Sequence, residues 1–325
     1  MPGWESWLPL HFGLAAALTW AARAYALRRR LLDHPGERRS HTAATPRGGG
    51  IAIVICLLLA TGACWRWSVL GPDLLGAFAA GLLLVAGIGW WDDHRPLSPL
   101  SRFVVQVVAA AVLAWGVHQQ ADNAWLGLLA FALALVLVNV WNFMDGINGL
   151  AASQAAIAAL GYALVGASAT PLLAGALLAA CLGFLPFNFP KARIFLGDVG
   201  SGALGYALAA LAVLSVGPAS AAWPVVMLPL AVFLVDAGFT LLSRMLAGDR
   251  WWTPHVTHVY QISARRHGHS AITVVYGGLS LLTLILMVLS SRSSTYTAIA
   301  ATFLGYLGLA AGWWFARNAT KTDKE

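Results

Sequence analysis

Eleven apolar runs, each close to the length that crosses a lipid bilayer, follow one another along this 325-residue chain. Their approximate cores are residues 7–27, 50–67, 74–91, 102–118, 124–141, 150–168, 171–187, 202–217, 221–243, 271–290 and 295–315. Only 10% of the residues are charged and 59% are hydrophobic, whereas soluble domains carry about 25% charged residues. We therefore expect an all-α polytopic membrane protein of about eleven transmembrane helices, with residues 1–325 forming a single integral-membrane domain.

The basic residues predict how these helices are oriented. Arg66 and Arg292 lie on one side of the expected membrane and Arg23 lies within the first run, whereas the rest of the 20 Lys and Arg residues fall on the opposite side. Because cytoplasmic loops carry the excess of Lys and Arg, we expect the amino end outside and the carboxyl end in the cytoplasm. The net charge of +7 resides in these short loops, so nucleic acid is not expected as a partner.

Loops that contain acidic residues gather on the expected cytoplasmic side. The cytoplasmic connections are residues 28–49, 92–101, 142–149, 188–201 and 244–270. Their acidic residues include Asp92, Asp93, Asp145 and Asp198, while the outward loops hold Asp73 and Asp122. One such residue alone would be an ordinary solvated loop residue. Four of them in glycine- and asparagine-rich loops on one face predict an active site built from the cytoplasmic loops.

Two of these loops suggest a metal–phosphate site. The adjacent carboxylates of Asp92 and Asp93 follow an apolar run, where they repel each other unless a cation intervenes. Phe195, Asp198 and Ser201 recur at a spacing of three just before an expected helix, among glycines that let a ligand approach the backbone. Since Mg²⁺ in proteins usually takes one or two carboxylates together with substrate phosphates, Asp198 is the predicted metal ligand. The ring of Phe195 is suited to stacking on a flat base.

The connection at 142–149 offers amides and a carboxylate. If this segment is helical, Asn142, Asp145 and Asn148 share one face, which suits a nucleotide base, a ribose or a hydrated cation. The alternative is a simple turn, because Asp-Gly and Asn-Gly are common turn dipeptides.

Two further loops carry groups suited to phosphate. Arg39 and His41 are followed by Pro46-Arg47-Gly48-Gly49-Gly50, which enters a helix, so cationic side chains and backbone N–H groups would form a phosphate cradle. The alternative is a positively charged loop with a helix-start turn. His255 and His258 stand three residues apart without the Glu of a metalloprotease motif or an obvious third ligand, which favours phosphate contact over zinc.

Asp236 lies inside the ninth apolar run. An acid within a membrane span is by default a functional hypothesis. Arg244 follows about two helical turns later, so a structural ion pair is the alternative.

With these loops in order, the chain resembles the polyprenyl-phosphate N-acetylhexosamine-1-phosphate transferase superfamily, bacterial members of glycosyltransferase family 4. Its best-known relative is the phospho-N-acetylmuramoyl-pentapeptide transferase of peptidoglycan synthesis. The resemblance covers the chain from Glu37 to about His269. It depends on Arg39-Ser40-His41 with Pro46 and Gly48-Gly49, Asp92-Asp93, Asn142 to Gly149, Phe195 to Ser201, Asp236 with Arg244, and His255 with His258.

The resemblance implies a multi-pass enzyme of the bacterial inner membrane. It would use Mg²⁺, with Mn²⁺ as an alternative, to join a UDP-amino sugar to undecaprenyl phosphate in the membrane lipid and release UMP. A homodimer is left open. By matching position, Asp198 would hold the metal, and Asp92 or Asp93 would be the catalytic acid–base or cation-steering groups. The nucleotide and its phosphates would meet Asn142, Asp145, Phe195, His255 and His258.

Two departures from the family pattern bear on the substrate. Asn148 stands where the family commonly has Asp, and Thr257 replaces a histidine of a denser cluster. The pattern at 255–261 therefore looks more like transferases that initiate O-antigen synthesis, including a branch that uses UDP-N-acetylfucosamine. The same chemistry in peptidoglycan or teichoic-acid synthesis is the alternative.

Two other classes of protein fit the composition. A secondary transporter of an anionic solute would place ionisable residues near the bilayer midplane and often show an internal repeat, but here only Asp236 is expected to lie deep. A purely structural membrane protein would not explain why the acidic residues gather on the expected cytoplasmic side.

Overall fold

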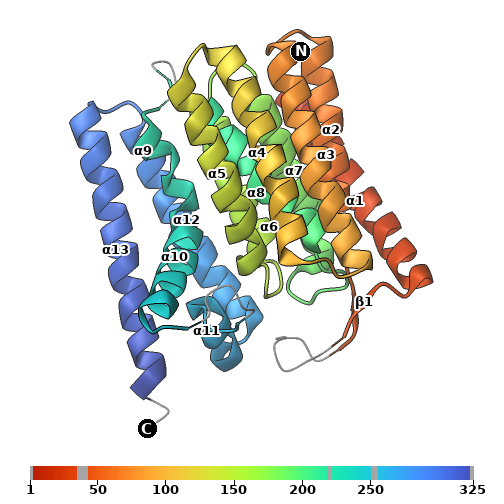
Figure 1. Ribbon diagram of the computed structural model, residues 1–325, viewed down its shortest axis with the longest axis vertical. Coiled ribbons are helices and arrows are strands. Elements are labelled where there is room, and N and C mark those ends of the chain that lie inside the picture. Colours follow the sequence, from red (N-terminus) through yellow and green to blue (C-terminus); the bar gives the residue numbers. More distant parts are fainter. Residues whose placement is uncertain (1–2, 35–42, 218–220, 250–254, 323–325) are drawn as a thin grey trace.

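A computed structural model describes residues 3–34, 43–217, 221–249 and 255–322 of the chain. They form a bundle of long helices in which α1 and α13 lie at opposite edges (Figure 1). The helices are α1 (Trp4–Arg29), α2 (Ile51–Arg66), α3 (Pro72–His94), α4 (Pro99–Ala121), α5 (Ala124–Met144), α6 (Leu150–Val165), α7 (Thr170–Asn188), α8 (Asp198–Leu214), α9 (Trp223–Val226), the 3-10 helix η1 (Leu228–Leu230), α10 (Ala231–Leu246), α11 (Val259–His267), α12 (His269–Ser290) and α13 (Thr295–Thr322). Two short strands, β1 (Leu32–Asp33) and β2 (Thr45–Pro46), pair antiparallel.

Each of the predicted apolar runs falls on helical structure, and one of them is broken. The run at 221–243 is divided into α9, η1 and α10. Pro229 lies at the break, where its missing N–H and its ring prevent a continuous α-helix. Between α10 and α12 lies α11, a polar nine-residue helix that the apolar pattern did not predict.

Length and hydropathy make this a polytopic membrane protein. Within the described part of the chain, seven segments are long and apolar enough to cross a bilayer, and α2, α6 and α8 are shorter apolar helices. The described termini lie at opposite ends of the bundle (Figure 1). Eleven crossings, and the orientation of the two ends, stay predictions from the sequence.

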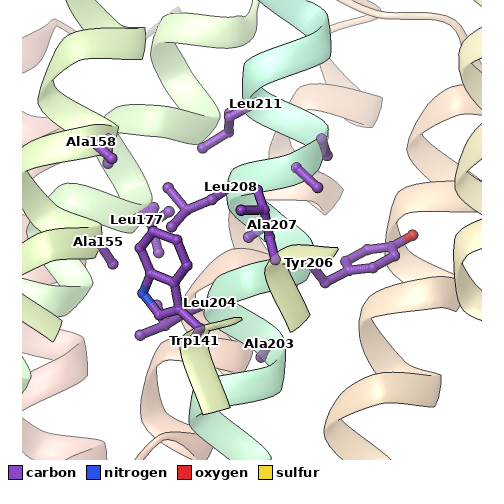
Figure 2. Close-up of a cluster of buried hydrophobic side chains, with 14 of the residues drawn as sticks. Trp141, Ala155, Ala158, Leu177, Ala203, Leu204, Tyr206, Ala207, Leu208 and Leu211 are labelled. Carbon is purple, nitrogen blue, oxygen red and sulfur yellow. The ribbon is translucent and has the colours of Figure 1, made fainter. Parts of the chain in front are cut away.

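The centre of the bundle is α8. Every residue from Val199 to Val213 is buried, and the helix packs against α3 and α5. Small residues alternate with Leu along it, so neighbouring backbones can approach closely. Leu204 and Leu208 lie beside Trp141 of α5, as Figure 2 shows, and the Tyr206 hydroxyl donates to the Ala77 carbonyl of α3 at 3.3 Å. This packing fixes the amino end of α8 against the carboxyl ends of α3 and α5.

Candidate active site

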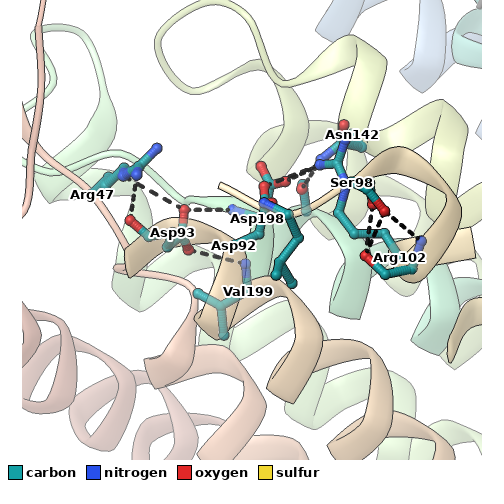
Figure 3. Close-up of polar contacts among 11 residues, drawn as sticks. Arg47, Asp92, Asp93, Ser98, Arg102, Asn142, Asp198 and Val199 are labelled. Carbon is teal, nitrogen blue, oxygen red and sulfur yellow. Dashed lines mark hydrogen bonds and ion pairs between the residues drawn. The ribbon is translucent and has the colours of Figure 1, made fainter. Parts of the chain in front are cut away.

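Asp93 joins the end of α3 to the start of α8. It is 1% exposed, and its two oxygens accept the backbone N–H groups of Asp198 and Val199 at 3.1 and 3.2 Å (Figure 3). A carboxylate at a helix amino end satisfies free N–H groups and the positive end of the helix dipole. Arg47 contributes its Nε at 3.8 Å from Asp93 Oδ1 and donates to the Asp93 main-chain carbonyl. Asp93 therefore acts as a cap for α8, supplied by another helix.

Asp92 points to a different group from its neighbour. Arg102 Nη1 lies 3.1 Å from Asp92 Oδ2 and 2.8 Å from Asp198 Oδ2 (Figure 3). The other oxygen of Asp92 accepts the Leu97 N–H at 2.7 Å. Two carboxylates from separate helices, α3 and α8, thus converge on a single cationic nitrogen.

A pocket of about 250 Å³ opens beside these carboxylates. It is lined by residues of the β1–α2, α3, α5–α6 and α7–α8 segments together with α11 and the start of α12. The lining residues are Asp33, Arg47, Asp93, Asp145, Gly146, Ile147, Asn148, Asn188, Phe195, Gly197, Asp198, Val256, Gln261, Arg265 and His269. Segments far apart in sequence therefore build one cavity at the end of the bundle where α11 and β1 lie (Figure 1).

Of the two alternatives for 142–149, the structure has the turn from Asp145 to Gly149, while Asn142 to Met144 continue α5. Helix α5 ends at Met144, where the backbone of Asp145 (φ −88°, ψ 50°) leaves helical geometry, and α6 begins at Leu150 after Gly149, which adopts the left-handed φ of +75°. Asp145 and Asn148 nevertheless both line the pocket. Asn142, still within α5, donates to the Ser201 hydroxyl at 3.1 Å.

Asp145 is crowded by other acids. Burial raises the pKa of Asp145 well above its usual value, and the carboxylates of Asp198 and Asp93 raise it further. The Asn148 side chain donates to the Pro190 carbonyl at 3.0 Å, which ties this turn to the α7–α8 segment. The concentration of negative charge is unfavourable unless a cation joins it.

Two amides at the glycine-rich start of α2, part of the predicted phosphate cradle, are bonded within the protein. Gly49 and Gly50 donate their N–H groups to the carbonyls of Phe195 and Leu196 at 2.9 and 2.8 Å. These amides hold the two loops together and are not directed at a ligand. Arg47 of the same segment does reach the pocket, whereas Arg39 and His41 lie outside the described residues.

The two histidines form a pair beside the pocket. The rings of His255 and His258 are 4.9 Å apart, and the Thr257 hydroxyl lies 3.0 Å from His255 Nδ1. Burial, helped by His258 and Arg244, lowers the pKa of His255 to about 4, so this ring is neutral at pH 7. Val256 between them lines the pocket, and phosphate contact by the histidines stays a prediction.

Sequence reasoning missed Arg102, Asn188, Gln261, Arg265 and His269 as site residues. A signal was available for Arg102, because a cation in the first turn of a helix opposes the helix dipole and so implies an acidic partner. Asn188 accepts the Gly149 N–H at 2.8 Å and donates to the Ile194 carbonyl at 2.9 Å. That bridge between two loops has no local signature.

The donor set fits a hard divalent cation that is completed by substrate. Among the residues that the structure describes, no three His, Cys, Asp or Glu side chains are arranged to hold a metal by themselves. Asp92 and Asp198 already share one cationic nitrogen. Mg²⁺ typically takes one or two carboxylates and fills its remaining positions with water and phosphate oxygens.

Fold and site together define a multi-pass membrane protein with an acidic, amide-lined pocket at one end of its helix bundle. Residues 75–216 match the family described as glycosyl transferase family 4. The chain is 31% identical over 314 residues to the decaprenyl-phosphate N-acetylglucosaminephosphotransferase of Mycobacterium tuberculosis, covering 81% of this chain and 78% of the relative. It is 33% identical over 316 residues to the protein of that name from Mycolicibacterium smegmatis, with the same coverage.

A third relative carries a different name. It is 34% identical over 191 residues to the phospho-N-acetylmuramoyl-pentapeptide-transferase of Limosilactobacillus fermentum, covering 52% of this chain and 60% of the relative. The chain belongs to the polyprenyl-phosphate N-acetylhexosamine-1-phosphate transferase superfamily.

Proposed function

We propose that this protein transfers an N-acetylamino-sugar 1-phosphate from a UDP-sugar to undecaprenyl phosphate and releases UMP, at the cytoplasmic face of a bacterial inner membrane. The observation that carries the proposal is the convergence of Asp92 and Asp198 on one cationic nitrogen at the edge of the pocket. A diphosphate needs a site of this kind, in which fixed acids, a cation and amide groups meet. The superfamily membership supplies the class of reaction.

The metal is part of the proposal. Asp198, with Asp92 beside it, would hold Mg²⁺ or Mn²⁺, and this ion would neutralise charge on the diphosphate as the leaving group departs. Arg102 beside these acids and Arg47, which lines the pocket next to Asp93, would offset further negative charge, as phosphoryl transfer requires.

The reaction needs positioning more than a strong base. A phosphate monoester has its second pKa near 6, so the lipid phosphate is largely a dianion at neutral pH. One of its oxygens attacks the sugar-linked phosphorus, and the bond to the UMP oxygen breaks with its electrons leaving on UMP. Asp92 orients the lipid phosphate or removes its remaining proton, and the alternative is a covalent phosphosugar on Asp92.

Asp93 has a different part in this proposal from the one that the sequence suggested. Both of its oxygens accept backbone N–H groups of α8, so it holds Asp198 in place. We assign the acid–base role to Asp92 alone. Asp145, Asn148 and Phe195 line the pocket and remain the proposed contacts for the nucleotide and its phosphates. Asn142 and Ser201, predicted as further contacts, bond to each other, and Ser201 is buried.

The proposed pathway is initiation of O-antigen or a related cell-envelope glycan. Its support is the pair of departures from the family pattern at Asn148 and Thr257, which change the polarity of the turn at 145–149 and of the segment that holds His255 and His258. Peptidoglycan or teichoic-acid synthesis by the same chemistry is the alternative. The relatives are named for two different sugar substrates, N-acetylglucosamine and phospho-N-acetylmuramoyl-pentapeptide.

The test is UMP release by the purified protein, offered undecaprenyl phosphate and a panel of UDP-N-acetylamino sugars. Release that requires the lipid phosphate, stops with a chelator and returns with Mg²⁺ is the expected result. A transporter would release no UMP from any donor, and that outcome would refute the proposal. The preferred donor would decide between the O-antigen branch and its alternatives.

A further inference from the structure

Asp236 is a buried acid in α10 for which the reaction has no use. It is 2% exposed, and its carboxylate accepts hydrogen bonds from three other helices, α11, α12 and α13, and from its own helix. The donors are Val259 N at 3.0 Å, Tyr260 N at 3.0 Å, the Tyr276 hydroxyl at 2.7 Å, Trp313 Nε1 at 3.2 Å and the Thr240 hydroxyl at 3.1 Å. Arg244, the ion-pair partner suggested by the sequence, has its Nη1 3.3 Å from Asp249.

Two of these donors are the first N–H groups of α11. Helix α11 begins at Val259, and its cap residue His258 makes no side-chain capping hydrogen bond. Asp236 therefore satisfies N–H groups that would otherwise lack partners, and its negative charge interacts favourably with the positive end of the helix dipole. A nine-residue helix is marginal in isolation, so its placement depends on such contacts.

Helix α11 carries one wall of the pocket. Gln261 and Arg265 of α11 both line the cavity. Tyr260, the residue held by Asp236, donates its hydroxyl to the Phe143 carbonyl at 2.8 Å and packs against Gly146, where a Cβ would collide with that hydroxyl. A continuous set of contacts therefore runs from Asp236 through α11 to the turn that contains Asp145.

We propose that Asp236 is a positioning residue for substrate binding. It fixes α11 by its amino end so that Gln261 and Arg265 face the pocket and Tyr260 supports the 145–146 turn. The expected change in KM rests on the proposed transferase function. The expected protection of the α11 amides from hydrogen exchange does not.

Asp236→Asn tests whether the carboxylate of Asp236 holds the amino end of α11 in place. An amide has one acceptor oxygen, and its NH₂ group would face a backbone N–H, so at least one of the two bonds to α11 is lost. We expect hydrogen exchange of the α11 amides to rise about tenfold, the effect of one lost hydrogen bond, with α12 unchanged. We also expect the KM for the UDP-sugar to rise about tenfold and kcat to change much less.

Val259→Pro is a gentler second variant. Proline is well tolerated at the first position of a helix, and His258 has the extended backbone, ψ 144°, that a residue before proline needs. This change removes one donor to Asp236 and leaves the carboxylate intact. It should raise the KM for the UDP-sugar and the hydrogen exchange of the α11 amides, as Asp236→Asn does. The proposal therefore stays testable if the Asn variant fails to fold.

Thr240→Val is the matched control. It deletes a hydrogen bond to the same carboxylate from α10 itself and leaves the bonds to α11 in place, so KM and exchange should stay at wild-type values. If Asp236 has only a structural role, Asp236→Asn will lower the folded fraction and leave the KM of the folded enzyme unchanged. That result would overturn the proposal. If the wild type releases no UMP, the proposed function fails. Hydrogen exchange of the α11 amides then still decides whether Asp236 holds the amino end of α11.

Discussion

At the scale of single residues, the site depends on two neighbouring acids that face different partners. Consecutive side chains on a helix point about 100° apart, so Asp93 faces the start of α8 while Asp92 faces Arg102 of α4. Both oxygens of Asp93 accept backbone amides of α8, whereas Asp92 gives one oxygen to the Leu97 N–H and the other to Arg102. This difference is why we propose a structural role for Asp93 and chemical roles for Asp92 and Asp198.

Asp198→Asn should abolish metal-dependent turnover without unfolding the protein. The amide keeps the shape of the side chain but removes the negative charge that would hold a divalent cation. The measurement is UMP release across a range of Mg²⁺ concentrations, with thermal unfolding of the detergent-purified variant as the control. Turnover near the wild-type rate would exclude Asp198 from the site.

Asp92→Asn should reduce kcat more than it changes UDP-sugar binding. Removal of a positioned acid–base group typically costs about 10²–10⁴-fold in rate, while the contacts proposed for the nucleotide stay in place. The measurement is kcat together with the Kd for the UDP-sugar. An unchanged rate, or a loss confined to binding, would contradict the assignment of Asp92.

At the scale of elements, the start of α8 sets the geometry of the acids. Gly197, the cap residue, adopts φ +76°, and a Cβ there would lie 2.5 Å from Asp93 Oδ2. Gly50 and Gly200 pack so closely that neither has room for a side chain. The backbone of α8 can therefore reach Asp93 only because these positions are glycines.

Gly197→Ala should destabilise the protein by about 2 kcal/mol, since it adds left-handed strain and a contact with Asp93. The matched control is Gly87→Ala in α3, where a Cβ meets nothing within 4 Å and helix propensity favours Ala slightly. Thermal midpoints of the two purified variants make the comparison. Equal midpoints would show that the amino end of α8 tolerates a side chain.

Local sequence predicts most of the helices, but it predicts the site only in part. Apolar runs predicted the long helices because burial in lipid needs about 20 apolar residues in a row, and Asp198 stood out because its loop is short and rich in glycine. At 142–149 the local sequence left both a helix and a turn open, and the structure has a turn from Asp145 to Gly149. Arg102, Asn188 and Gln261 act through contacts between distant segments, which no local pattern encodes.

At the scale of the whole molecule, the site is confined to one end of the helix bundle. The ends of α3, α5 and α7 and the starts of α8 and α11 meet there (Figure 1), so a water-soluble donor and a membrane-bound acceptor can reach one pocket. All but three of the 20 Lys and Arg residues fall on one side of the membrane in the sequence pattern, which predicts that this end faces the cytoplasm.

Cysteine labelling tests that orientation. Arg95→Cys places an exposed thiol in the α3–α4 connection beside Asp92, and Ser293→Cys places one in the α12–α13 connection, exposed at the other end of the bundle. The native cysteines Cys56, Cys64 and Cys181 are buried, so they give a low background. A membrane-impermeant maleimide added to intact cells should label the Ser293→Cys variant only, and inverted vesicles should reverse the result, because the reagent reaches one face at a time. Labelling of the Arg95→Cys variant in intact cells would place the pocket outside, where neither UDP-sugars nor the proposed reaction would be found.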